Sequence, residues 1–212
     1  MKLYTYWRSQ ATFRVRIALA IKGITHENVV INLEHGDQNR PEYKKLNPQM
    51  VVPTLFDGEV KLFQSLAILE YLEEKYPTPP LLPKDVAARA WVRGFALINI
   101  ADSHPLIVPR IRNYLTGTLG LSEQQRIAWI QHWLGAGLQA METLLAERKN
   151  PDKFCYGDTP TVADICLMTQ VTPAQLFKTD LAPYPRVMEI HARCMEIPAF
   201  ANSHPRKQPD AE

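Results

Sequence analysis

The spacing of apolar residues in the first third of the chain changes from strand-like to helix-like and back. Residues 2–7 are strand formers, and residues 12–21 have helical spacing that is closed by Gly23. Residues 26–32 then predict a second strand, and a short helical piece follows near residues 42–46. This order predicts a strand-helix-strand unit at the start of the chain.

The next segment predicts a hairpin followed by a helix. In VVPTLFDGEVKLF, the dipeptide Asp57-Gly58 separates two apolar runs, which is a strong hairpin signal. The stretch QSLAILEYLEEKY then has helical spacing, and we expect its buried stripe to contain Leu66, Leu69, Tyr71, Leu72 and Tyr76. A strand-helix-strand unit followed by two strands and a helix predicts a thioredoxin-like sheet.

Prolines separate this region from the rest of the chain. The segment YPTPPLLP, residues 76–83, disfavours helix and strand alike, because each proline lacks an N–H and fixes φ. We therefore predict a thioredoxin-like α/β N-terminal domain over residues 1–82 and an all-α C-terminal domain over residues 83–212. The predicted helices of the second domain span residues 86 to about 114, 122–149, 161 to about 177, and 185–195. The polar, proline-rich tail SHPRKQPDAE is expected to lie along the surface.

The composition narrows the possible functions. A chain of 212 residues that is 46% hydrophobic and 22% charged is typical of a folded globular protein. A net charge of +2, without a basic block interleaved with aromatic residues, argues against binding to nucleic acid. The N-terminus lacks a signal-peptide core, and no apolar run approaches the roughly 20 residues of a membrane span. We therefore expect a cytoplasmic protein.

Several reactive or charged side chains are interpreted as structural. The three cysteines, Cys155, Cys166 and Cys194, and the histidines have no metal-binding or redox spacing, so we expect buried reduced thiols and no metal site. Thr161 and Asp164 have the spacing of a helix-capping box. Two further residues on the first helix, Arg14 and Arg16, are expected to form ion pairs on a partly solvent-facing helix, although Arg14 could also add to the field of a nearby site.

The candidate chemistry lies in the turn after the first strand. In a thioredoxin-like sheet the next helix directs its unpaired N–H groups and positive dipole end at this turn. Here the turn contains Ser9 and no cysteine, so any thiol chemistry requires a thiol from a cofactor. A second candidate is Pro53 in VVPTL: a cis bond would let Val52 pair through its N–H and C=O with an extended peptide, whereas an ordinary edge-strand proline would not.

A third candidate lies at the start of the helix QSLAILEYL. Ser65 is expected at the N-cap with Gln64 before it, so a carboxylate could bind the free N–H groups there. Alone, this is an ordinary helix cap. Taken together, the three candidates predict a peptide ligand with a thiol at one end and a free α-carboxylate at the other, which describes glutathione.

These motifs resemble the zeta class of glutathione transferases, the family of maleylacetoacetate and maleylpyruvate isomerases. The resemblance covers nearly the whole chain, through YWRSQATFRVRIALAIKGI, LNPQMVVPTL, QSLAILEYLEEKYPTPPLLP, DTPTVADICLMTQV and SHPRKQPD. It implies the glutathione transferase fold, glutathione as cofactor, a homodimer, and the cis-trans isomerisation of a maleyl keto acid. Among these acids we favour maleylpyruvate, which would become fumarylpyruvate.

The resemblance also implies where glutathione would bind. The residues that it places around the cofactor are Ser9 with the N–H groups near Ala11 at the sulfur, Gln38 and Val52 on the peptide, Gln64 and Ser65 at the γ-glutamyl end, His104 at the glycine end, and Asp102 from a neighbouring subunit. This chain departs from the family pattern at three positions. A second serine and a cysteine are replaced by Gln10 and Ala11, and an arginine associated with the substrate carboxylate is replaced by Leu176.

A dianionic substrate calls for arginine, whose planar fork can bind a carboxylate with two hydrogen bonds. We expect Arg8 and Arg110 to bind the substrate, with Arg110 supplying the charge that is absent at Leu176. Maleylacetoacetate remains an alternative substrate. A transferase that consumes glutathione on an electrophile such as a haloacid, and a non-enzymatic binding protein with the same fold, are the other functions considered.

Overall fold

The computed structural model describes residues 1–148 and 152–212. Contacts divide these residues into two compact units, of which the first combines Met1–Leu81 with Glu196–Glu212 and the second is Leu82–Met195. The C-terminal tail therefore groups with the N-terminal residues. The single division into domains of residues 1–82 and 83–212 remains a prediction.

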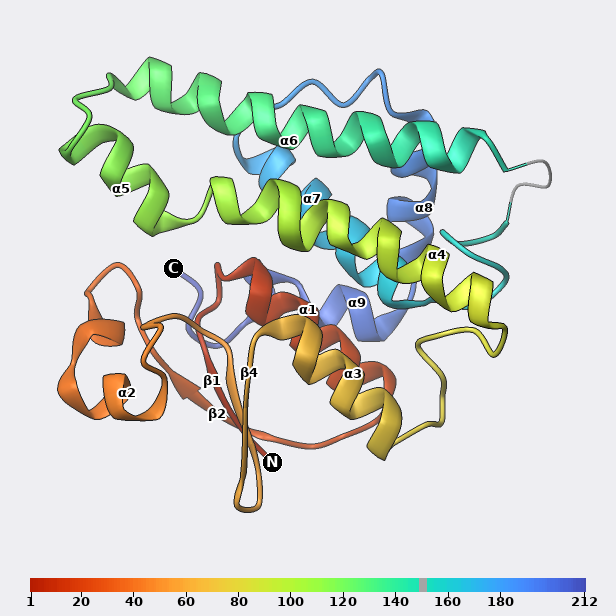
Figure 1. Ribbon diagram of the computed structural model, residues 1–212, viewed down its shortest axis with the longest axis horizontal. Helices are drawn as coiled ribbons and strands as arrows, with labels where there is room; N and C mark the ends of the chain where they lie inside the picture. The colour runs from red at the N-terminus through yellow and green to blue at the C-terminus, as the bar shows by residue number, and fades with distance from the viewer. Residues whose placement is uncertain (149–151) are drawn as a thin grey trace. The chain divides into compact units, whose positions relative to one another are not determined.

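The first unit is built on a four-stranded sheet of order β2-β1-β3-β4 (Figure 1). β1 (Lys2–Thr5) pairs in parallel with β2 (Glu27–Val30) and antiparallel with β3 (Thr54–Asp57), and β3 pairs antiparallel with β4 (Val60–Phe63). The predicted hairpin is present, but its turn is formed by Gly58 and Glu59, because Asp57 is the last residue of β3 and pairs with Val60. This mixed sheet confirms the thioredoxin-like N-terminal fold.

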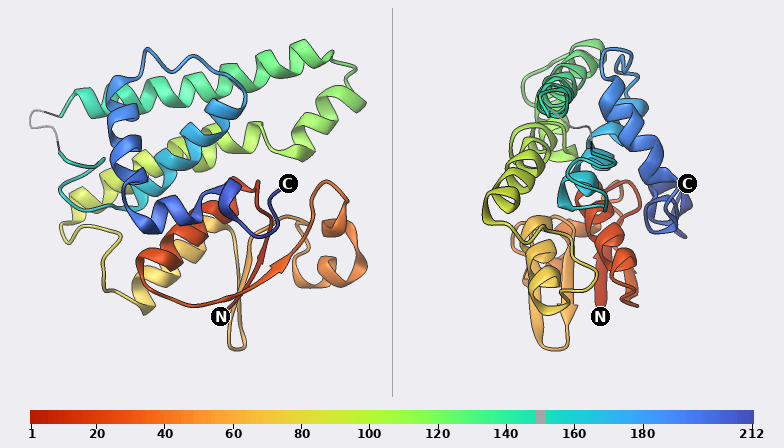
Figure 2. Two further views of the ribbon diagram at one scale, coloured as in Figure 1. Left: turned by 180° about the vertical axis from the view of Figure 1, so that it is seen from behind. Right: turned by 90° about the vertical axis from the view of Figure 1, so that its right-hand side faces the viewer.

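Helices cover this sheet. α1 (Gln10–Ile21) packs against α3 (Ser65–Lys75) and against α9 (Pro198–Ser203), which the views of Figures 1 and 2 show beside it. α2 (Pro41–Leu46) precedes β3 along the chain. Residues 12–19 of α1 are all buried, because other elements surround this helix.

Two expectations about burial in these helices are wrong. Arg14 and Arg16 do not face solvent, since only 2% and 3% of their surfaces are exposed. On α3, Leu69 and Leu72 are buried as predicted, but Leu66, Tyr71 and Tyr76 are only partly buried. The buried face of α3 is shifted around the helix and consists of Ser65, Ile68, Leu69, Leu72 and Glu73.

The second unit is helical. Its α-helices are α4 (Val86–Leu97), α5 (Pro109–Gly117), α6 (Glu123–Ala146), α7 (Val162–Leu176) and α8 (Pro185–Met195). The single helix expected over residues 86 to about 114 is wrong, because the π-helical segment Ile98–Ser103 and the 3-10 turn His104–Leu106 separate α4 from α5. Pro105 and Pro109, which lack N–H groups, stand at this break. The predicted end of the α6 helix at Lys149 lies outside the described residues.

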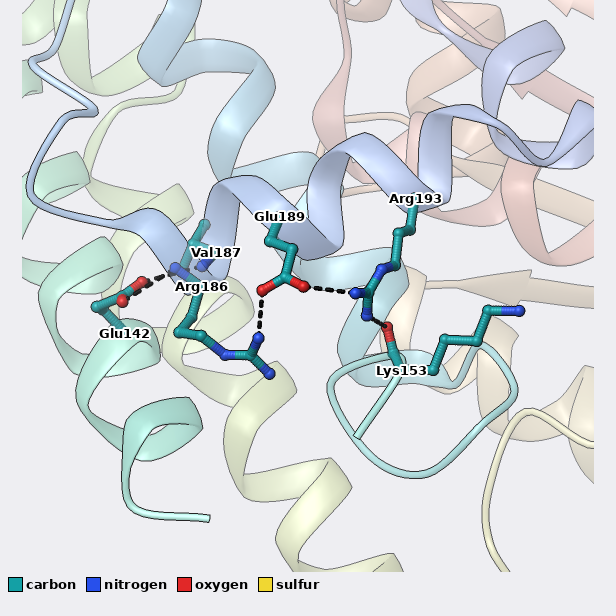
Figure 3. Close-up of polar contacts among 6 residues, drawn as sticks. All are labelled: Glu142, Lys153, Arg186, Val187, Glu189 and Arg193. Carbon is teal, nitrogen blue, oxygen red and sulfur yellow. Dashed lines mark hydrogen bonds and ion pairs between the residues drawn. The ribbon is translucent and has the colours of Figure 1, made fainter. Parts of the chain in front are cut away.

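Side chains cap the N-termini of α7 and α8 in this unit. Thr161 and Asp164 form the predicted capping box, with Asp164 Oδ2 accepting the Thr161 N–H at 2.7 Å. α8 is capped from a distance, because the Glu142 carboxylate of α6 accepts the N–H groups of Arg186 at 3.1 Å and Val187 at 2.9 Å (Figure 3). This second cap joins residues more than forty positions apart.

The cysteines are free and buried, as expected. Burial raises the pKa of the Cys155 and Cys194 thiols, so neither is an activated nucleophile. Within the described part of the chain, no group of three or more His, Cys, Asp or Glu side chains could hold a metal ion. Over the same residues, no helix is long and apolar enough to cross a membrane.

Candidate active site

The turn from β1 to α1 places Ser9 at the N-cap of the helix. Its backbone is extended, and its Oγ accepts the Thr12 N–H at 3.2 Å. The helix therefore begins at Gln10, two residues before the predicted start. A hydroxyl that accepts one hydrogen bond still has its own proton to donate. The Ala11 N–H has no acceptor among the described residues, so this turn offers two donors and a helix dipole to an anion.

Arg8 lies beside this turn but already has partners. Its guanidinium forms an ion pair with Glu34 and lies 5.5 Å from the centre of the Trp7 ring. About a third of the Arg8 side chain, 35%, is exposed. A substrate carboxylate would therefore compete with Glu34 for Arg8. No spacing pattern links Arg8 to Glu34, because the two residues are 26 positions apart in the chain.

Strand register brings the three sequence-predicted candidates to the same end of the sheet. Thr54 of β3 pairs with Tyr4 of β1 on one side and with Phe63 of β4 on the other. Beyond this row of paired residues, the chain continues into the segments that hold Ser9, Val52 and Gln64.

Val52 has the properties required of a peptide-binding backbone. The Val52-Pro53 bond is cis, and among the described residues neither the N–H nor the C=O of Val52 forms a hydrogen bond. The preceding loop is held by Tyr43, whose hydroxyl donates to the Val51 carbonyl at 2.7 Å, and by Asn47, whose amide donates to the same carbonyl at 2.9 Å. Burial raises the pKa of Tyr43, which keeps its hydroxyl protonated as a donor.

The start of α3 differs from the sequence interpretation. Gln64, with φ 67°, occupies the N-cap, and Ser65 is the first helical residue rather than the cap. The Ser65 hydroxyl is buried and accepts a hydrogen bond from Nε of Arg14 at 3.0 Å. The Gln64 amide donates to the side chain of Gln49 at 2.9 Å. Sequence spacing did not reveal this link between Arg14 and α3.

Gln38 supplies an acceptor without a partner. It lies in the 3-10 turn Asp37–Asn39, and its amide nitrogen donates weakly to the Leu33 carbonyl at 3.4 Å. Its Oε1 is shielded from solvent and accepts no hydrogen bond among the described residues. Buried side-chain oxygens usually have partners, so this atom suits a ligand N–H.

The remaining predicted residues belong to the second unit. Asp102 is exposed in the π-helical segment, and His104 begins the 3-10 turn that follows it. Arg110 is exposed near the start of α5, and within the described residues it forms no ion pair. Leu176, at the end of α7, is 50% exposed. The roles of these residues remain predictions.

The first-unit residues fit glutathione. The helix N-terminus at Ser9 suits a thiolate, the free backbone of Val52 suits an extended peptide, and the unpaired oxygen of Gln38 suits an amide N–H. The first turn of α3 leaves N–H groups for an α-carboxylate.

Comparison with protein families gives two matches. Residues 1–74 match the family described as "Glutathione S-transferase, N-terminal domain", and residues 109–202 match "Glutathione S-transferase, C-terminal domain".

Three similar proteins are informative. A "Probable maleylacetoacetate isomerase" of Vibrio cholerae is 44% identical over 99% of this chain and 97% of its own length. A holo structure of maleylpyruvate isomerase, described as a bacterial glutathione S-transferase of the zeta class, is 44% identical over the whole of both chains with a TM-score of 0.98. A maleylacetoacetate isomerase of Methylobacterium extorquens AM1, solved with bound malonate and glutathione, is 42% identical over both whole chains with a TM-score of 0.97.

Proposed function

Because the chain belongs to the zeta class of the glutathione S-transferase family, we propose that it is an enzyme that uses glutathione to isomerise maleylpyruvate to fumarylpyruvate. The observation that carries this proposal is the position of Ser9 at the N-cap of α1, where the hydroxyl keeps a proton to donate. The glutathione and the dicarboxylate malonate bound to a similar isomerase support both ligand classes.

When bound, glutathione would supply a thiolate nucleophile for reversible addition to the alkene, with the alkene electron pair moving to the conjugated carbonyl oxygen, so that the remaining single bond could rotate before elimination restores the thiolate. The task of Ser9 is to hold that sulfur in its ionised form. A charge-assisted hydrogen bond contributes about 1.5 to 3 kcal/mol, which corresponds to a thiol pKa lowered by about one to two. The Ala11 N–H and the helix dipole act in the same direction.

The other first-unit residues would position the cofactor. We assign the backbone of Val52 and the side chain of Gln38 to its peptide groups, and Gln64 with the N–H groups that begin at Ser65 to its γ-glutamyl carboxylate. These contacts would hold the sulfur near its target, which converts a bimolecular addition into an oriented one.

We propose that Arg8 and Arg110 bind the two carboxylates of the substrate. Arg8 would exchange its partner Glu34 for a substrate carboxylate, whereas Arg110 has no ion pair to give up within the described residues. Glu34→Gln is then expected to lower the KM for maleylpyruvate, and Arg110→Ala to raise it. An unchanged KM in either variant would remove that arginine from the binding site.

Two further glutathione contacts belong to the same proposal. His104 would approach the glycine end, and Asp102 would reach the γ-glutamyl amine of a cofactor bound to the second subunit of a homodimer. Sedimentation of the purified protein checks the dimer, and a monomer at working concentration rules out the role of Asp102. A cytoplasmic location likewise remains a prediction.

The deciding experiment offers the protein maleylpyruvate and maleylacetoacetate separately, with catalytic glutathione, and follows loss of the maleyl chromophore. We expect turnover of both acids, faster with maleylpyruvate, and no loss of free thiol when thiols are counted before and after. Stoichiometric loss of thiol would instead show a conjugating transferase. Full turnover after all low-molecular-weight thiols are removed would disprove the proposed mechanism.

The role of Ser9 has its own test. Ser9→Ala is expected to reduce kcat about 10- to 100-fold, the loss of one charge-assisted hydrogen bond. Ser9→Thr is the matched control, because threonine keeps both the hydroxyl and the ability to cap the helix. Equal activity of Ser9→Ala and the unmodified enzyme would mean that the hydroxyl does not stabilise the thiolate.

A further inference from the structure

The C-terminal tail reaches back to the candidate active site of the first unit. The Oδ2 atom of Asp210 accepts the backbone N–H of Trp7 at 2.9 Å, although the two residues are 203 positions apart. Trp7 precedes Arg8 and Ser9, so this hydrogen bond falls within the turn that carries both. The tail is therefore more than a surface extension.

A buried arginine holds the same turn from the other side. The guanidinium of Arg16 donates to the Trp7 carbonyl at 3.2 Å and to the Tyr6 carbonyl at 3.5 Å. It also donates to the hydroxyl of Thr5 at 3.3 Å and to the carbonyl of Ser203, at the end of α9, at 3.2 Å. Arg16 thus joins the turn to the segment from which the tail begins.

The two contacts together fix Trp7 through both its backbone groups. Its carbonyl is held by Arg16 and its N–H by Asp210. The Tyr6 carbonyl also accepts the Ser9 N–H at 3.0 Å, which closes the turn around Trp7. Burial lowers the pKa of Arg16 to about 10, while the nearby charge of Asp210 opposes that shift. Freedom at Trp7 would pass directly to Ser9, because only one residue separates them.

We propose that Asp210 is a positioning residue of the thiolate site, which it serves by holding the Trp7 peptide, and with it the Ser9 hydroxyl, in place. This inference rests on the proposed role of Ser9 toward bound glutathione. In this proposal the C-terminal tail affects the reaction by keeping Ser9 in position and does not contact glutathione.

Loss of the Asp210 charge and loss of the Asp210 hydrogen bond are expected to shift the pKa of the bound glutathione thiol in opposite directions, so the sign of the shift shows which of the two matters. Removing a nearby negative charge would, by electrostatics alone, favour an anion and lower the pKa of a bound thiol. Loss of a correctly placed Ser9 donor would raise that pKa instead. Asp210→Ala is expected to raise the pKa of the bound glutathione thiol by about one, which leaves about tenfold less thiolate below that pKa.

The experiment measures this pKa from the ultraviolet absorbance of the thiolate in the glutathione complex. Asp210→Asn keeps an oxygen acceptor for Trp7 but loses the charge, so the thiol pKa is expected to lie at or slightly below its original value. Glu212→Gln removes an exposed charge two residues further on, and is the charge-matched control. An unchanged or lowered pKa in folded Asp210→Ala overturns the proposal.

Two additions keep the test decisive. In glutathione-free protein, amide hydrogen exchange of the peptide containing residues 6–9 should accelerate in Asp210→Ala and not in Glu212→Gln. If Asp210→Ala does not fold, Asp210→Glu retains the charge but displaces the carboxylate, and it should also raise the thiol pKa. If Ser9→Ala itself leaves that pKa unchanged, the proposed role of Ser9 fails, and faster exchange in Asp210→Ala would show only that the tail orders the turn.

Discussion

The β1–α1 turn and the π-helical segment Ile98–Ser103 are both irregular backbone held by side-chain hydrogen bonds, but by different kinds of group. The turn is held by charged residues, Arg16 and Asp210. The π-helical segment is held by uncharged hydroxyl and amide groups.

In the first unit, three buried cations of α1 and its C-cap each hold a different segment. Arg14 donates to Ser65 at the start of α3, and Arg16 donates to carbonyls of the β1–α1 turn. Lys22 donates to Glu73 at 2.9 Å and to the carbonyls of Tyr76 and Pro79 at 2.6 and 3.0 Å. Two of these segments are candidate sites for an anion, so the groups that hold them also add positive potential there.

In the second unit, the corresponding network is neutral. Asn99 donates to Gln170 at 2.7 Å and accepts from Thr169 at 3.0 Å. Gln170 in turn donates to Ser103 at 2.8 Å and to the Leu134 carbonyl at 3.0 Å. All four side chains of the network are at most 1% exposed.

The comparison shows that buried side chains can fix the position of a backbone segment without also creating an electrostatic field around it. Burying a charge costs far more than burying an amide that is fully hydrogen-bonded. The neutral network therefore fixes the backbone that carries Asp102 at a low desolvation cost. The charged contacts of the first unit have a higher desolvation cost, but their positive charge also favours binding of an anion.

The largest expected effect comes from breaking a charged contact. Lys22→Met removes the Lys22 cation from the Glu73 carboxylate, whose side chain is 8% exposed, and should lower the free energy of unfolding by about 3–5 kcal/mol. Urea unfolding measures this loss. The double variant Lys22→Met/Glu73→Leu, which removes both charges, should recover much of it. A loss of equal size in the double variant would mean that the hydrogen bonds of Lys22 and Glu73 to the backbone, and not the pairing of their charges, hold this segment.

The neutral network should instead be broken by steric overlap. A Cβ added at Gly137 of α6 would lie 2.4 Å from Nε2 of Gln170, which cannot move away because both its hydrogen bonds and its burial fix it. Gly137→Ala should therefore cost about 1–3 kcal/mol of stability. Thermal and urea unfolding would show this loss, while the pKa of bound glutathione should stay unchanged.

Gly135 of the same helix provides the matched control. An added Cβ there would lie 3.6 Å from the hydroxyl of Tyr184, which is an ordinary contact. Alanine also favours helix over glycine by about 1 kcal/mol, so Gly135→Ala should be neutral or stabilising. If both variants lose the same stability, crowding of Gln170 is not the cause.

Local sequence signals predicted much of the fold. The Asp57-Gly58 hairpin, the Thr161–Asp164 capping box and the α8 helix all depend on residues close together in the chain, and all are found. The expectation that a helix begins beside Ser9 rests on the same kind of signal, and Ser9 is the N-cap of α1, while the roles of the site residues remain predictions. Helix caps can be predicted locally, because the capping side chain binds a backbone N–H group only two or three residues further along the chain.

Contacts between distant residues were not predictable in this way. Arg14 and Arg16 read as solvent-facing because α1 carries polar residues, yet their partners Ser65 and Ser203 lie far along the chain. The break after Leu97 was missed because the residues that hold it are about seventy positions away on α7. Periodicity shows which face of a helix is apolar and does not show which polar group finds a buried partner.

A smaller effect is expected from Thr169→Val, which removes one hydroxyl without changing the shape of the side chain. The Oδ1 atom of Asn99 then loses the hydrogen bond from Thr169, which should cost about 1 kcal/mol. Because no charge is involved, urea unfolding should give the same cost at low and high salt. A cost that falls with added salt would contradict the neutral character of this network.

The smallest effect is expected at the hairpin turn, where charge acts at the surface of the first unit. Asp57 accepts hydrogen bonds from Lys75 at 2.5 Å and Tyr71 at 2.9 Å, and these lower its pKa below the usual 3.8. Asp57 is the last residue of β3 and the turn itself consists of Gly58 and Glu59, so Asp57→Asn changes the charge and leaves the turn residues as they are. Its stability loss should be below that of Thr169→Val, because solvent screens exposed pairs.

The pH dependence of that loss separates charge from hydrogen bonding. A carboxyl with a lowered folded-state pKa stabilises the fold above its unfolded pKa, and this contribution disappears as the pH falls through the folded value. The difference in unfolding free energy between the unmodified protein and Asp57→Asn should therefore be constant near neutrality and shrink below a pH of about 4. Urea titrations across this range measure it. A difference that persists in acid would assign the effect to the geometry of the hydrogen bonds, which would make this turn resemble the neutral network of the helical unit.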